Sequence, residues 1–155
     1  MITVVQAVLI VLQVFQVAFL WLHDWVPLRR LNDVKAVQAA DSRKHLVIVT
    51  LIQSVPFTLG LIFALINLRG RWPHWVESWL LISYGLLLLG ELRAWWFPYL
   101  VRADAQRAER YRAMFGNTHS FLPVRNGFAP NTLHIMLHVT TLGTVALLVV
   151  HALWV

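Results

Sequence analysis

Hydrophobic positions fall into four long runs that are separated by polar segments. The runs cover residues 2–22, 46–68, 79–101 and 132–155. An α-helix rises about 1.5 Å per residue and a bilayer core is about 30 Å thick, so roughly 20 apolar residues span a membrane. The only Lys, Arg, Asp or Glu residues in these runs are Glu91 and Arg93. The pattern predicts an all-α integral membrane protein, with residues 1–155 forming one antiparallel four-helix bundle.

The polar segments between the runs carry weaker patterns of their own. Apolar residues recur every third position over 28–37, which is typical of an amphipathic surface helix, although a solvated connector explains them equally well. Residues 103–113 are rich in helix formers and are expected to extend the third helix after a break at Pro98. Residues 115–131 mix turn formers with large apolar side chains, which indicates an ordered loop, and Asn131 or Thr132 can cap the fourth helix.

Composition supports a membrane environment and narrows the chemistry. Hydrophobic residues make up 59% of the chain, charged residues only 13%, and the mean hydropathy is +0.65. The chain has no cysteine, so disulfides, thiolate catalysis and cysteine-ligated metals are excluded. The net charge is +6, but the basic residues gather in two loops beside apolar runs, where they suit anionic lipid headgroups rather than nucleic acid.

The distribution of basic residues also predicts an orientation. Ten Lys and Arg residues lie between runs one and two or three and four, against two, Arg69 and Arg71, between runs two and three. Lys and Arg are retained in the cytoplasm during insertion. We therefore expect loops one and three to be cytoplasmic and both termini outside, in a bacterial inner (plasma) membrane. Tryptophans near the ends of the runs are expected at the two membrane interfaces, with Trp72 on the outer side.

Polar side chains inside the runs are the candidates for function. Counted at about 1.5 Å per residue, Gln16, Gln53, Glu91 and His138 all lie roughly 9 to 12 Å from the cytoplasmic end of their helices. With the shallower His134, they form a predicted ligand or proton site. Such a layer can also serve only to fix the register of the helices through hydrogen bonds, and the sequence leaves both interpretations open.

Two further interpretations concern ligands. His134 and His138 lie four residues apart on one helix face, so with Glu91 they provide the ligands of a zinc or iron site, although no cofactor is required and a histidine pair is often satisfied by backbone. The sequence also offers three candidates for binding an anionic ligand, which are Arg93, Arg125 and His119. Their simpler role is contact with lipid phosphate.

Three classes of function remain open. The first is a membrane protein that binds or moves a polar or amphiphilic ligand, or protons, with Glu91 and His138 in contact directly or through one water. The second is a membrane enzyme acting on a lipid-borne anionic substrate, and the third is an assembly subunit. Membrane lipids are the expected partners. A transporter of this size would need more enclosed volume than four short helices provide, so a homodimer is also considered.

Overall fold

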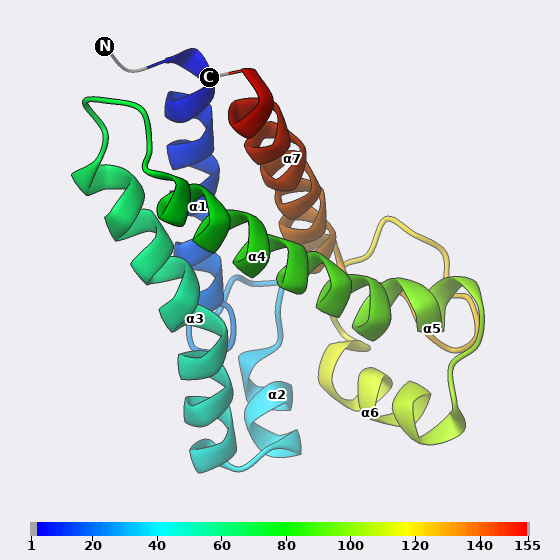
Figure 1. Ribbon diagram of the computed structural model, residues 1–155. Coiled ribbons are helices and arrows are strands. Elements are labelled where there is room, and N and C mark those ends of the chain that lie inside the picture. Colours follow the sequence, from blue (N-terminus) through cyan, green and yellow to red (C-terminus); the bar gives the residue numbers. More distant parts are fainter. Residues whose placement is uncertain (1–2, 155) are drawn as a thin grey trace.

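The computed structural model describes residues 3–154 and contains four helices long and apolar enough to cross a membrane. They are α1 (Val4–Leu22), α3 (Arg43–Ile66), α4 (His74–Glu91) with its continuation, and α7 (Thr132–Trp154). Two shorter helices, α2 (Val34–Ala40) and α6 (Ala105–Phe115), lie at the end of the molecule opposite both chain ends (Figure 1). The predicted all-α class with four long apolar helices is therefore confirmed.

Most helix boundaries follow the apolar runs closely, and Ile2 and Val155 lie outside the described residues. The exception is α4, which begins at His74 rather than at residue 79 and so includes Glu77. The helix thus begins five residues before the apolar run does. The Glu77 side chain is buried inside the protein, beside two histidines.

Several helix starts are explained by short polar side chains that satisfy free backbone N–H groups. Thr3 and Gln6 form a capping box on α1, and Ser42 accepts from the backbone N–H of His45, so α3 begins at Arg43. Asp33 and Asp104 cap α2 and α6 in the same way. Because Asp33 caps the start of α2, only residues 34–37 of the amphipathic segment predicted over 28–37 are helical.

The third long helix is interrupted near its end. After α4, residues Leu92–Trp96 form a π-helix, η1, followed by α5 (Phe97–Leu100). Pro98 has no N–H to donate to the preceding turn, so the wide turn falls just before it. The chain then leaves the helix and Asp104 starts α6. The prediction that residues 103–113 extend the third helix was therefore wrong. Most of this segment belongs to the separate helix α6.

The four long helices pack in neighbouring pairs. Helix α1 packs on α3 and α7, and α4 packs on the same two helices. Helices α3 and α4 are in close contact at Gly60, where an added Cβ would lie 2.8 Å from Leu80 Cδ2. Nearby, the Trp79 indole N–H donates to the Pro56 carbonyl at 3.0 Å. Toward α2 and α6 the two helices diverge, because α4 runs obliquely in front of α1 (Figure 1).

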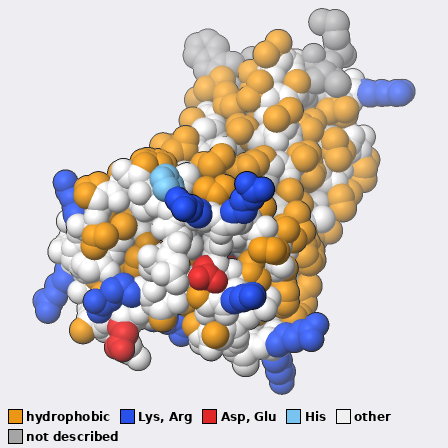
Figure 2. All heavy atoms as spheres, turned by 180° about the vertical axis from the view of Figure 1, so that it is seen from behind, with side chains coloured by type: hydrophobic (Ala, Val, Ile, Leu, Met, Phe, Trp, Pro, Cys, Tyr) orange, Lys and Arg blue, Asp and Glu red, His pale blue; other side chains and the backbone are white. Residues whose placement is uncertain are grey.

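The segments 23–42 and 101–131 fold against each other at one end of the long helices, and we call them the end cap. Arg110 donates to Asp41 at 2.6 Å, and the His119 N–H donates to the Arg30 carbonyl at 2.6 Å. Tyr111 donates its hydroxyl to the buried Ala129 carbonyl. Lys and Arg side chains gather around this end, whereas the surface above it is mainly apolar (Figure 2). We refer to the two halves of the long helices as the cap half and the terminal half.

Candidate functional site

A cavity of about 360 Å³ lies between α1, α3, α4 with η1, and α7 in the cap half of the molecule. Its apolar wall includes Leu86, Leu87 and Leu137, and its titratable residues come from three different elements: His23, Glu91, His134 and His138. Only one of these, Glu91, carries a carboxyl group, and no Lys or Arg lines the cavity. The cavity therefore combines hydrocarbon walls with a small number of polar groups, as ligand sites commonly do.

Glu91 is the last residue of α4, directly before the π-helix. Its side chain belongs to a residue only 5% exposed, and its Oε1 lies 2.9 Å from the Thr141 hydroxyl. The other oxygen, Oε2, has no hydrogen-bond partner among the described residues. The π-helix changes the path of the backbone directly after Glu91, where the carboxyl group reaches the cavity. Single turns of π-helix are frequent at functional sites.

His134 is oriented by the residue that caps its helix. Asn131 Oδ1 accepts from the His134 backbone N–H at 2.9 Å, which confirms Asn131 as the cap, and lies 2.7 Å from the His134 Nδ1. An amide oxygen only accepts, so Nδ1 must carry the proton. In the neutral ring this leaves Nε2 as the acceptor. The Trp95 ring packs against the imidazole with centroids 4.0 Å apart.

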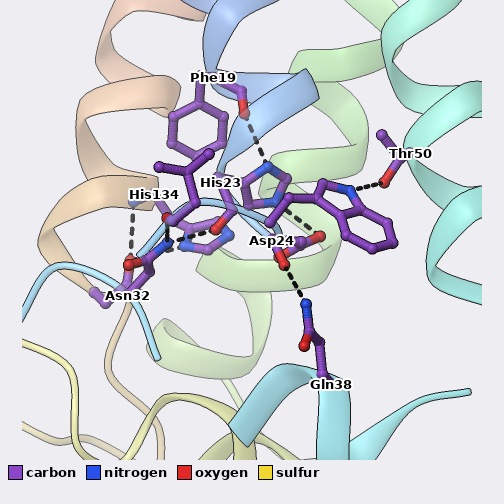
Figure 3. Close-up of polar contacts among 10 residues, drawn as sticks. Phe19, His23, Asp24, Asn32, Gln38, Thr50 and His134 are labelled. Atoms are coloured by element: carbon purple, nitrogen blue, oxygen red, sulfur yellow. Dashed lines mark hydrogen bonds and ion pairs between the residues drawn. The ribbon is translucent and has the colours of Figure 1, made fainter. Parts of the chain in front are cut away.

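His23 and Asp24 form a pair beside His134 (Figure 3). His23 Nδ1 lies 3.0 Å from the Phe19 carbonyl, which only accepts, and Nε2 lies 3.2 Å from Asp24 Oδ2. Since Nδ1 carries one proton, the contact at Nε2 requires a second proton, on the ring or on the carboxyl. Burial raises the pKa of Asp24, the nearby His23 opposes this, and Asp41 adds to the increase. The pair thus provides a place for one exchangeable proton.

Asn32 holds this pair in place from the end cap (Figure 3). Its amide donates to the carbonyls of His23 at 2.5 Å and Val26 at 2.8 Å, and its oxygen accepts from the Leu28 N–H at 2.6 Å. Neither Asp24 nor Asn32 was identified from the sequence, because both follow the first apolar run and resembled ordinary loop residues. The adjacent His-Asp pair at a helix end was the available signal.

The structure brings four of the five predicted ligand-site residues to the cavity: Gln53, Glu91, His134 and His138. Gln53 lies on α3 at the edge of the cavity, and its side chain is exposed. Gln16 is not part of the lining and instead donates to the Thr144 hydroxyl at 3.1 Å. Glu91 and His138 make no direct hydrogen bond, because Glu91 contacts Thr141, one turn further along α7. Both nitrogens of His138 lack partners in the described part of the chain. A contact through one water stays a prediction.

The metal and anion hypotheses receive no geometric support. Within residues 3–154 no group of three or more His, Asp or Glu residues is arranged to hold a metal ion, including His134, His138 and Glu91. The three anion candidates lie away from the cavity lining. Arg93 shares an outer groove with Arg107, Arg125 lies over the Tyr99 ring, and His119 Nδ1 is 2.7 Å from the Thr132 hydroxyl.

Comparisons of this chain with protein-family models, with curated proteins and with solved structures find no match.

Proposed function

We propose that the four long helices cross a membrane as an antiparallel bundle, with the end cap in the cytoplasm, and that the cap-half cavity binds an amphiphile from the adjacent leaflet. The head group would donate hydrogen bonds to Glu91 and His138. One observation carries this proposal: Glu91 Oε2 and both His138 nitrogens are buried at a cavity and have no hydrogen-bond partner in the described chain. Unmet hydrogen-bonding capacity of this kind calls for a ligand or a functional explanation.

The form of the cavity favours an amphiphile over a fully polar molecule. Its volume of about 360 Å³ is at the small end of the range for ligand sites, about 300 to 1,000 Å³. The leucines on its wall suit a hydrocarbon chain. Helices α3 and α4 diverge on this side, and the exposed Gln53 marks the edge of the cavity between them. A single-chain amphiphile could therefore enter sideways from lipid.

The polar groups favour a cationic or neutral head group over an anionic one. A carboxylate only accepts hydrogen bonds, and a neutral imidazole offers one acceptor and one donor. The cavity lining contains no Lys or Arg to balance a negative charge, and the Arg93, Arg125 and His119 side chains lie elsewhere. For the same reason an enzyme acting on an anionic lipid is the weaker alternative.

The orientation can be tested with single-cysteine variants, because the chain contains no cysteine. A membrane-impermeant maleimide should label Arg71→Cys in intact cells and should label Arg107→Cys only after the membrane is opened. This expectation rests on the excess of Lys and Arg in the end cap. The reverse labelling pattern would show that the end cap faces outward.

Ligand binding can be tested with three pyrene-tailed C12 amphiphiles that differ only in their head group: ammonium, hydroxyl or carboxylate. The protein is placed in nanodiscs and energy transfer from tryptophan to pyrene is measured. The ammonium compound should bind about tenfold more tightly than the carboxylate, since a charge-assisted hydrogen bond contributes about 1.5 to 3 kcal/mol. The hydroxyl compound should fall between them.

Two variants connect this binding to the cavity. Glu91→Gln should weaken ammonium binding about tenfold while largely retaining the hydroxyl compound, because the amide can still accept a hydrogen bond. The matched control is Glu109→Gln, which changes an exposed carboxylate on α6. Equal affinity for all three head groups, or equal effects of the two variants, would disprove the proposed role of Glu91.

A further inference from the structure

A second buried carboxyl and imidazole pair lies in the terminal half of the molecule. Glu77 on α4 is 5% exposed and His151 on α7 is fully buried. His151 Nδ1 lies 3.2 Å from Glu77 Oε1, without the alignment of a hydrogen bond, and His74 Nδ1 lies 3.3 Å from Glu77 Oε2. Trp72 covers the pair, with its ring centroid 4.8 Å from that of His151. Trp72 is 2% exposed, and its place at the outer membrane interface stays a prediction.

A row of buried polar side chains leads from the cavity toward this pair. Thr141 and Thr144 lie on the same face of α7 as His138, at spacings of three residues. Thr141 contacts Glu91, and Thr144 accepts from Gln16 on α1. Gln13 lies one turn from Gln16 toward the terminal half and is also fully buried. The row thus continues past the depth that the cavity reaches.

In this row, neither amide atom of Gln13 has a hydrogen-bond partner in the described chain. The buried Tyr84 hydroxyl also has none, and Tyr84 lies on α4 seven residues from both Glu77 and Glu91, on the same helix face. Each buried polar group left unpaired costs about 1 to 3 kcal/mol, a cost that an apolar residue of similar size would avoid. Buried polar atoms of this kind can bind water where there is room for it and where about two to four polar partners surround it. Their placement between two carboxyl groups points to movement of protons.

We propose that this row conducts protons across the whole span, between the cap-half cavity and the Glu77–His151 pair. The proposal depends on the membrane insertion proposed above but not on amphiphile binding. On the cap side the proton is received by His23 and Asp24. The His23 and His134 ring centroids are 5.7 Å apart, and those of His134 and His138 are 6.3 Å apart. Glu91 follows these imidazoles in the cavity.

Glu91 can take part in either protonation state. The Thr141 oxygen lies 2.9 Å from both Glu91 Oε1 and the Leu137 carbonyl. Thr141 can donate to a carboxylate, or donate to Leu137 while accepting from a protonated Glu91. From there, water held by the row passes the proton to His151 and Glu77. Each group that accepts a proton on one side releases one on the other, so the protein is unchanged after each passage and the electrochemical gradient sets the direction.

The neighbours of the Glu77–His151 pair include the titratable His74 and the charged Arg71. His74 faces Glu77 from the same helix, His151 faces it from α7, and Arg71 on the preceding loop is close enough for its charge to act on His151. Glu77 therefore lies between two imidazoles, His74 on its own helix and His151 on α7, so the three side chains can pass a proton from one to the next. His74 is almost fully exposed and connects the pair to the solvent at that end.

Proton flux in proteoliposomes tests the proposal. The protein is reconstituted with pyranine inside, and a potassium gradient with valinomycin drives protons inward. The wild type should acidify the interior about tenfold faster than protein-free liposomes, and Gln13→Leu and Glu77→Gln should each remove most of this difference, since tenfold in rate corresponds to about 1.4 kcal/mol of barrier. The matched controls, Gln106→Leu and Glu109→Gln on exposed positions of α6, should keep the wild-type rate.

Gln13→Leu also separates conduction from folding. The variant replaces an unpaired buried amide with an apolar side chain of similar size, so its melting temperature should stay equal or rise. Its binding of the pyrene-ammonium probe should also be unchanged, because Gln13 does not line the cavity. Wild-type flux equal to that of empty liposomes, or full flux in a folded Gln13→Leu protein, overturns the proposal. Flux without probe binding would overturn only the proposed amphiphile site.

Discussion

The two halves of the long helices use the same residue types in different ways. In the cap half, α3 and α4 diverge, and Glu91, His134 and His138 line a cavity. In the terminal half, the two helices touch at Gly60, and Glu77 with His151 is enclosed between helices. The difference shows that a carboxyl group beside a histidine does not define a ligand site by itself. The separation of the surrounding backbones decides whether such side chains line a cavity or contact only their neighbours.

The largest effect on stability is expected in the end cap, where the Asn32 amide holds the backbone of the cavity residue His23. Asn32→Ala removes three hydrogen bonds at once and leaves partly buried backbone groups without these partners, so it should lower the unfolding free energy by about 3 kcal/mol. The matched variant in the terminal half is Asn67→Ala, which removes one hydrogen bond to the Phe63 carbonyl and should cost about 1 kcal/mol. Thermal unfolding in detergent measures both, and equal losses would contradict the supporting role of Asn32.

A second prediction concerns the contact between α3 and α4. Gly60→Leu should destabilise the protein by about 2 kcal/mol, because even a Cβ there would lie 2.8 Å from the buried Leu80. The same unfolding measurement applies. A variant as stable as the wild type would mean that the two helices are not held together at this point.

The corresponding glycine of the cap half should behave in the opposite way. Gly90 lines the cavity and an added Cβ would meet nothing within 4 Å, so Gly90→Leu should change stability by less than about 1 kcal/mol. It should nevertheless fill the cavity and weaken binding of the pyrene-ammonium probe by about tenfold or more. Gly143→Leu on α7, which also has open space around it but is outside the cavity, is the control. Unchanged binding in Gly90→Leu would place the ligand elsewhere.

The smallest effect is a pH dependence of stability at Asp24, the partner of His23. Burial raises the pKa of Asp24 above its unfolded value, so the folded protein binds this proton more tightly. The stability that the proton provides is present below the unfolded pKa, about 3.9, and is lost as the pH rises through the folded value. The stability of Asp24→Asn relative to the wild type should therefore increase from pH 3 to pH 8. A change in the opposite direction would show that the attraction of His23 outweighs burial.

Local signals in the sequence were sufficient for part of the site. Asn131 lies three residues before His134, which is the spacing of a cap to the N–H that it binds, and His134 and His138 share one helix face. Depth counted along the helices also placed Glu91 beside the correct part of α7. It did not predict that Glu91 would contact Thr141, because a difference of one turn lies within the error of counting residues from the end of an apolar run.

By itself, the sequence determined the four long apolar helices and the set of polar residues inside them, because hydropathy and helical period are local properties of the chain. Only the tertiary structure decided which of these residues share a space. The rotation of α1 directed Gln16 to Thr144 and away from the cavity, and the early start of α4 buried Glu77 beside His151. The divergence of α3 and α4 opened the cavity at Glu91. These outcomes depend on contacts between residues far apart in the sequence, where the packing of side chains selects one arrangement among many that share the same hydropathy pattern.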